Sequence, residues 1–142
     1  MTKIGANLIE EVFAAWREGR ADDVLARFAP NAVWHFSAGT RPPAIGREAI
    51  QAFLAAYGAL WRESRVRVLR RAWAESTVFF EAVEDVTDHQ GREIIVPYCG
   101  VVTCHHGLIS DWRDYFDRGL LEGQMAGTSG FPDYAQPLIG NP

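Results

Sequence analysis

An aspartate, Asp114, stands between large aromatic side chains in the C-terminal half of the sequence. It follows a glycine-containing turn at residues 105–107, in a run whose pattern predicts a strand. Alternation along a strand places Trp112, Asp114 and Phe116 on one face. A carboxyl group beside two rings indicates an apolar pocket, where its pKa is raised and acid–base chemistry becomes possible. The alternative is that Asp114 pairs with a neighbouring arginine on a solvated face.

A second aspartate, Asp85, is a candidate partner for Asp114. It lies on a predicted strand at residues 77–88, where alternation puts Phe79 and Val83 on its face. If that face lines the pocket, the two carboxyl groups approach each other across it. Two carboxyl groups in an apolar cavity do not both ionise, so one keeps its proton as an acid and the other serves as a base. Such a pair suits water addition to an epoxide and proton transfer in a cyclisation equally well.

The elements that must position these groups follow from hydrophobic periodicity. Residues 4–18, 21–28, 46–61 and 118–124 read as helices, and residues 31–36, 66–75, 77–88, 94–104 and the segment from the turn at 105–107 to 117 read as strands. This order predicts an α+β fold in which a curved, mostly antiparallel sheet wraps around the helices. A cavity between a curved sheet and a long helix is the default site for a small ligand.

The length and composition predict one domain at residues 1–126 and a tail at 127–142. The tail is rich in Gly, Pro and Ser; it is either partly ordered or docked through Phe131, Tyr134 and Leu138. The net charge of −4 argues against nucleic acid and anionic membranes as partners. No apolar run reaches the ~20 residues of a membrane span, and we see no signal peptide.

The cysteines and histidines predict a cytoplasmic protein without a metal. Cys99 and Cys104 lie five residues apart on one predicted strand. They should point to opposite faces and lie too far apart to bridge, which indicates reduced thiols in the cytoplasm. The four histidines show no metal-ligand spacing.

Several segments carry a resemblance to a known superfamily. Residues 13–16, 23–34 and 42–50 resemble the cone-shaped barrels of the nuclear transport factor 2-like superfamily. Within it, residues 107–117, with the run Trp-Arg-Asp-Tyr-Phe-Asp, resemble the branch of limonene-1,2-epoxide hydrolase and SnoaL-like polyketide cyclases. The resemblance covers residues 8–121. It implies a mixed or antiparallel curved sheet, a homodimer and catalysis without a cofactor.

The resemblance assigns roles residue by residue. Epoxide hydrolases of this branch use two aspartates held by an arginine, and Asp114 and Asp85 fall on the aspartates. The arginine's position holds Val83. The tyrosine and asparagine that hold the water in the family are Trp34 and Phe36 here; Trp34 keeps one N–H donor and Phe36 has none.

A substitute cation is available on the predicted strand 66–75. One of Arg70 and Arg71 must face inward if the strand is regular, and our hypothesis is that it reaches the aspartate pair. The alternative is that both form surface pairs with Glu75 or Glu81. For the dimer, Arg65, Arg67, Val101 and Tyr115 alternate in a way that fits a partner across the outer face of the sheet.

These residues favour an acid–base enzyme acting on a small apolar substrate, most directly an epoxide hydrolase. Its predicted pocket residues are Trp34, Phe36, Phe79, Val83, Trp112 and Phe116. The alternatives are a SnoaL-like polyketide cyclase or isomerase, and a dimer of the same fold that binds a hydrophobic ligand without turnover. The ketosteroid-isomerase branch is disfavoured, because the position of its basic aspartate is Phe36 here.

Overall fold

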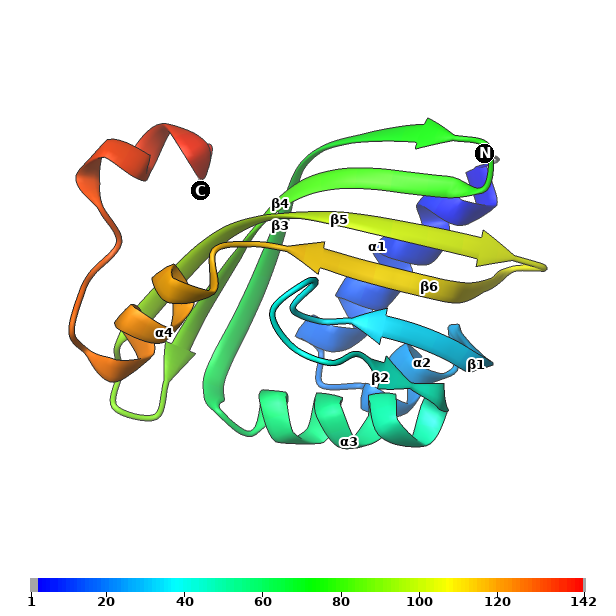
Figure 1. Ribbon diagram of the computed structural model, residues 1–142, viewed down its shortest axis with the longest axis horizontal. Helices are drawn as coiled ribbons and strands as arrows, with labels where there is room; N and C mark the ends of the chain where they lie inside the picture. Colours follow the sequence, from blue (N-terminus) through cyan, green and yellow to red (C-terminus); the bar gives the residue numbers. More distant parts are fainter. Residues whose placement is uncertain (1–2, 142) are drawn as a thin grey trace.

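The computed structural model describes the backbone of residues 3–141 and the side chains from residue 8 onward. It contains one six-stranded sheet with the strand order β2-β1-β6-β5-β4-β3. The strands are β1 (Phe28–His35), β2 (Ala44–Ile45), β3 (Trp61–Ala74), β4 (Thr77–Asp88), β5 (Glu93–His105) and β6 (Leu108–Tyr115). All neighbours are antiparallel except β1 and β6, which are parallel. The α+β class and the curved mixed sheet are as predicted (Figure 1).

The helices gather on one face of this sheet. They are α1 (Lys3–Arg17), α2 (Ala21–Leu25), α3 (Gly46–Gly58) and α4 (Arg118–Ala126). Helix α1 lies against β3 and β4, and α3 lies against β1 (Figure 1). Leu8, Ile9 and Val12 of α1 are buried, whereas Glu10 and Glu11 are exposed, so a single apolar stripe seats this helix on the sheet.

Long strands bend around the helices and fix which residues face inward. On β4, the residues Val78, Phe80 and Ala82 are almost fully buried on the face that meets α1. The ring of Phe80 lies over Gly100 of β5, where an added Cβ would stand 2.1 Å from the ring. Glycine at this position therefore gives the ring the space from which it packs edge-on against Trp112 of β6.

Several predicted boundaries differ from the observed ones, most clearly where a helix meets a strand. Helix α2 ends at Leu25, and Phe28 already belongs to β1, where it pairs with Ile109 of β6. Helix α3 ends at Gly58 rather than Trp61, and β3 begins at Trp61 rather than Val66 because it pairs with Asp88 of β4. In each case a strand partner distant in sequence extends the strand at the expense of the helix.

The C-terminal tail lies along the outer side of β3. Its 3₁₀ helix (Asp133–Leu138) is followed by Asn141, whose carbonyl oxygen accepts a hydrogen bond of 2.9 Å from Arg67. Ala135 and Ile139 are buried, while Tyr134 and Leu138 are 88% and 55% exposed. Of the three side chains expected to dock the tail, Phe131 is half-buried, whereas Tyr134 and Leu138 are exposed. The separation of the tail from the domain at residue 127 stays a prediction.

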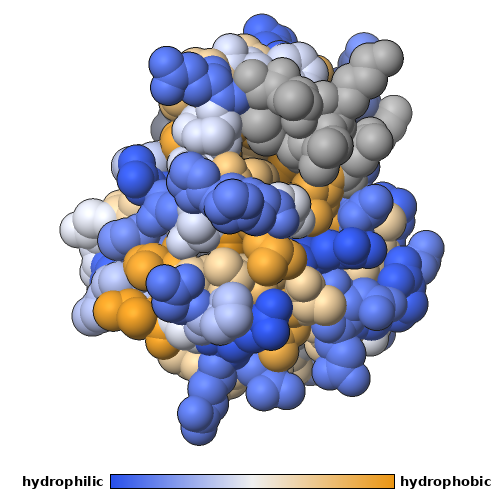
Figure 2. Space-filling model, turned by 90° about the vertical axis from the view of Figure 1, so that its right-hand side faces the viewer, coloured by the Kyte–Doolittle hydropathy of each residue, from blue (hydrophilic) through white to orange (hydrophobic). Residues whose placement is uncertain are grey.

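The surface mixes polar and apolar side chains. Figure 2 shows the face on which the β3–β4 and β5–β6 hairpins end, where hydrophobic side chains reach the surface between hydrophilic ones. Trp73 and Phe79, near the β3–β4 turn, are 45% and 44% exposed. Within the described residues, none of the helices is both long and apolar enough to cross a membrane.

Candidate functional site

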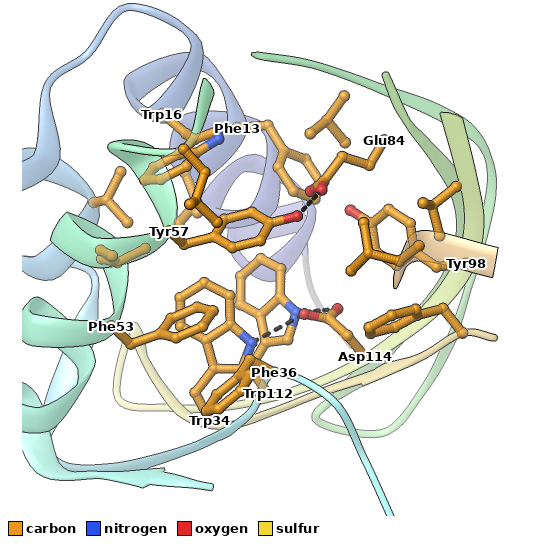
Figure 3. Close-up of a pocket in the computed structure, with 18 of the residues that line it drawn as sticks. Phe13, Trp16, Trp34, Phe36, Phe53, Tyr57, Glu84, Tyr98, Trp112 and Asp114 are labelled. Atoms are coloured by element: carbon orange, nitrogen blue, oxygen red, sulfur yellow. Dashed lines mark hydrogen bonds between the residues drawn. The ribbon is translucent and has the colours of Figure 1, made fainter. Parts of the chain in front are cut away.

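A cavity of about 200 Å³ lies between the inner face of the sheet and helices α1, α3 and α4. Its walls are mainly aromatic: Phe13, Trp16, Trp34, Phe36, Phe53, Tyr57, Tyr98, Trp112 and Phe116 all line it (Figure 3). Two carboxyl groups, those of Asp114 and Glu84, interrupt this apolar wall. An apolar cavity with a few convergent polar groups is the usual form of a small-molecule site.

Asp114 is held by two indole groups. Trp34 Nε1 donates to Oδ2 at 3.0 Å, and Trp112 Nε1 donates to Oδ1 at 2.8 Å. The geometry follows from the sheet, because β1 and β6 run in parallel with Trp34 opposite Trp112, and Asp114 lies two residues beyond Trp112 on the same face. Both carboxyl oxygens thus receive an N–H donor, which fixes the plane of the group (Figure 3).

The surroundings of Asp114 shift its ionisation into the physiological range. Burial raises its pKa from 3.8 to about 7; the two indole N–H groups act in the opposite direction, and the nearby Glu84 raises the pKa further. Asp114 is half-buried and lines the cavity. A carboxyl group with such a pKa can both accept and release a proton near neutral pH.

Glu84 of β4 is the second acid of the cavity. Its carboxylate accepts a short hydrogen bond from the hydroxyl of Tyr57 on α3. Burial raises the pKa of Glu84, and the Tyr57 hydrogen bond partly offsets this. Tyr98 of β5 also points into the cavity, near both carboxyl groups, which raise its pKa together with burial (Figure 3). The site therefore combines two carboxyl groups and two phenols in one apolar space.

Comparison with known proteins assigns the family. The sequence matches the SnoaL-like domain over residues 9–112. The chain belongs to the SnoaL-like family. No match was found among curated proteins.

Solved structures share the fold of this SnoaL-like protein at low sequence identity. An epoxide hydrolase of M. tuberculosis resembling limonene-epoxide hydrolase has a TM-score of 0.76 and 20% identity, with 89% of this chain and 92% of that chain covered. A putative polyketide cyclase of Xanthomonas campestris has a TM-score of 0.73 and 20% identity, with 87% and 97% covered. The epoxide hydrolase/cyclase-like enzyme SalBIII has a TM-score of 0.73 and 18% identity, with 80% and 90% covered.

The structure does not bring Asp85 to Asp114. Asp85 lies on the outer face of β4, where its carboxylate pairs with Arg65 at 3.0 Å. Phe79 and Val83 share that outer face, Phe79 being half-exposed and Val83 buried outside the cavity. This corrects the expectation that these three residues line the pocket. The strand was assigned correctly, but the inward residues are the even-numbered ones.

The sequence holds a signal that could have found Glu84. Of the six even-numbered residues of β4, the four at positions 78, 80, 82 and 86 are apolar, and two, Glu84 and Asp88, are acids. The odd-numbered positions from 79 to 87 hold two acids and a threonine. The more apolar set is the one that faces the core, so counting both sets favours Glu84 as the inward acid.

The four remaining predicted pocket residues lie in the wall of the cavity. They are Trp34, Phe36, Trp112 and Phe116. Trp34 keeps its predicted donor, since its indole N–H binds Asp114 directly. The roles of these residues in binding or catalysis stay predictions.

Neither arginine proposed as a substitute cation reaches the two acids of the cavity. Arg70 pairs with Glu81 at 3.1 Å on the outer face, as the alternative foresaw, and Arg71 pairs with Glu10 of α1. Among the described side chains, the cation that lines the cavity is Arg118, at the first position of α4. Arg118 was not among the predicted site residues, because nothing in the local sequence pattern links this helix to the cavity.

Among the described side chains, no group of three or more His, Cys, Asp or Glu residues could hold a metal ion. Cys99 is exposed and Cys104 is half-buried, and both are free thiols.

Proposed function

We propose that this SnoaL-like protein is a cofactor-independent acid–base enzyme that hydrolyses the epoxide of a small apolar molecule. One observation carries the proposal: Asp114, with a pKa of about 7, is held by two indole N–H groups in an apolar cavity that also contains the half-buried acid Glu84. Carboxyl groups perturbed in this way cluster at functional sites.

The roles of the two acids follow from their hydrogen bonds. Asp114 accepts two N–H donors, which stabilise its anion, whereas Glu84 accepts one from Tyr57. In the catalytic form of the pair, which holds one proton, Asp114 is the ionised base and Glu84 the protonated acid; because the pKa of each group is raised, the proton can pass between them near neutral pH. Asp114 takes a proton from water, the water oxygen forms a bond to an epoxide carbon, and the C–O bond breaks as Glu84 protonates the leaving oxygen. Transfer of the proton from Asp114 to Glu84 restores the starting state.

Cyclisation is the second candidate. The polar side chains that line the cavity include two acids, two phenols and Arg118, and these groups can hold a hydroxyl group of the substrate as well as a water molecule. A hydroxyl group of the substrate could replace water as the nucleophile, with the same roles for both acids. Support comes from the fold neighbour SalBIII, which has a role in pyran ring formation.

A panel of apolar epoxides, some with an internal hydroxyl group, tests both candidates. Product analysis distinguishes diols, formed by water, from cyclic ethers, formed by the internal hydroxyl. We expect Asp114→Asn to lower kcat about 10²- to 10⁴-fold, the usual contribution of a positioned base. Asp85→Asn on the outer face is the matched control and should leave kcat unchanged. Turnover that survives in Asp114→Asn would remove this residue from the mechanism.

The absence of any turnover would argue against an enzyme. If the wild type binds apolar ligands but converts none of the panel, the non-catalytic ligand-binding function becomes the better explanation. Binding is measured by the shift of Tm, which rises with the concentration of any ligand that binds the native state.

A homodimer is part of the same proposal. Phe79 and Tyr115, which lie on the outer face of the sheet, are 44% and 48% exposed. A second copy covering that face would bury them. Sedimentation velocity of wild type and Phe79→Asp checks this: a wild-type monomer, or a dimer unaffected by the substitution, would contradict it.

A further inference from the structure

We infer that the substrate of this cavity carries an anionic oxygen group, such as a carboxylate, at the end remote from the reacting atoms, and that Arg118 at the cavity mouth binds it. The inference rests on the proposed function, because it assigns the substrate class of the same site. It starts from the position of Arg118 and the charges around it.

Arg118 lies where the cavity meets solvent. Its side chain is 27% exposed, yet it lines the cavity together with Leu121 and Met125 of the same helix. Another lining residue, Leu60 in the turn between α3 and β3, is 42% exposed. These partly exposed residues mark the mouth, whereas the two acids and the indoles form the interior. A ligand whose apolar part fills the interior brings its outer end close to Arg118.

The guanidinium of Arg118 is held in place from two sides. Its Nε donates to Glu122 at 2.8 Å, and its Nη1 donates to the hydroxyl of Ser37 at 3.2 Å. Ser37 is only 2% exposed, and the next residue is tied to β6 by a hydrogen bond from Ala38 N to Asp114 O at 3.0 Å. Within residues 3–141, Nη2 of Arg118 makes no hydrogen bond to the protein. The guanidinium is thus positioned with one nitrogen free to bind a ligand.

The carboxylate that holds Arg118 is shared with a second arginine. Oε1 of Glu122 accepts from Arg118 and also from Arg41, at 3.3 Å, so two guanidinium groups share one carboxylate. Arg41 is not part of the cavity lining. A carboxylate on the ligand would accept a charge-assisted hydrogen bond from the free Nη2 of Arg118.

The interior of the cavity, unlike the mouth, disfavours an anionic group. Asp114 and Glu84 lie there without a cation among the described side chains, so an anionic group would be repelled from it. Together the two regions orient a ligand, with the neutral apolar end inward and the anionic end at the mouth. The cavity of about 200 Å³ is slightly larger than the 150 Å³ engineered cavities that hold benzene, which fits a single ring with a short chain.

Three ligands of one shape test the inference without any epoxide chemistry: 3-phenylpropanoate, its methyl ester and 3-phenylpropylamine. Their Kd values are measured at low salt by the quenching of tryptophan fluorescence and by calorimetry. We expect the carboxylate to bind wild type about tenfold more tightly than the ester, as one hydrogen bond to a charged group allows. The amine should bind no more tightly than the ester.

Arg118→Gln and Arg41→Gln form a matched pair, because each removes one positive charge and one partner of Glu122. We expect Arg118→Gln to abolish the preference for the carboxylate while the ester still binds, and Arg41→Gln to change each Kd less than threefold. Equal weakening by both variants would show a general charge effect and overturn the inference. A tighter amine would overturn it as well, as would the loss of ester binding in Arg118→Gln, which would mark Arg118 as structural.

These results separate the inference from the proposed function. An Arg118-dependent preference for the carboxylate in a protein that opens no epoxide would leave the ligand class standing and refute the chemistry. Epoxide turnover without any preference for the carboxylate would refute the ligand class and leave the chemistry standing.

Discussion

Two neighbouring acids on β4 have opposite environments. Glu84 points into the cavity, accepts a hydrogen bond from Tyr57 and has a pKa raised by burial. Asp85, the next residue, points to the outer face and pairs with Arg65 at 3.0 Å. Successive side chains of a strand point to opposite faces, so two adjacent acids lie in different environments.

The contrast extends to the whole sheet. On the outer face, acids pair with arginines, as in Arg65–Asp85 at 3.0 Å, Arg70–Glu81 at 3.1 Å and Arg113–Asp111 at 2.8 Å. On the inner face, the two cavity acids have hydrogen-bond donors but no arginine among the described side chains. Buried acids without a cation destabilise the folded protein when they ionise. Such an arrangement is expected where a raised pKa serves a reaction.

The largest expected effect concerns the pH dependence of stability. The folded-state pKa of Asp114, about 7, exceeds the ordinary 3.8, so the unfolded chain loses this proton first. The stability that the protonated carboxyl contributes is therefore complete below about pH 4 and falls as the pH rises to about 7. At about 1.4 kcal/mol per pKa unit, the loss is at most about 4 kcal/mol.

Asp114→Asn removes this titration. We expect the free energy of unfolding of wild type, relative to the variant, to fall between pH 4 and 7 and to be constant above pH 8. Urea denaturation of both proteins across this range measures the difference. Asp85→Asn is the control and should show no such fall. A constant difference between wild type and Asp114→Asn would mean that Asp114 ionises like an ordinary surface acid.

A smaller effect, on kcat, is expected when each of the two neighbouring acids on β4 is replaced by its amide. Glu84→Gln keeps the shape of the side chain but removes the proposed acid, and we expect kcat on an epoxide to fall about 10²-fold, or about 2.7 kcal/mol. Asp85→Asn should change kcat less than twofold. Steady-state kinetics of both variants measure this. If the two substitutions lower kcat equally, the position of Glu84 on the inner face of β4 does not give it a role in catalysis that Asp85 on the outer face lacks.

Much of the sheet could be predicted from the sequence. The bounds expected for β4, residues 77–88, are those observed, because long alternating runs between turn residues specify a strand strongly. The apolar surroundings of Asp114 could also be predicted, since aromatic rings two residues away on either side indicate an apolar face of the strand. These features depend on neighbours along the chain, which the sequence displays directly.

The missed features depend on contacts between distant segments. Alternation groups Glu84 with the more apolar face of β4, but both faces mix apolar and acidic residues, so the count favours this face as the inward one without fixing it. The partner of Glu84 is Tyr57, on a helix 27 residues away. Arg118 meets Ser37 across 81 residues. Such pairs follow from the packing of α3 and α4 on the sheet, which no local pattern encodes.

The smallest expected effect lies on the outer face. The Arg65–Asp85 pair is partly exposed, at 39% and 18% of the two side chains. Partly exposed pairs of this kind gain little Coulomb energy in a high dielectric and are screened by salt. A double-mutant cycle with Arg65→Gln and Asp85→Asn should therefore give a coupling of about 0.5 kcal/mol, vanishing in 1 M salt. Urea denaturation measures it. A coupling of several kcal/mol, unchanged by salt, would place a strongly desolvated charge pair on the outer face as well, and the two sides of β4 would no longer differ in kind.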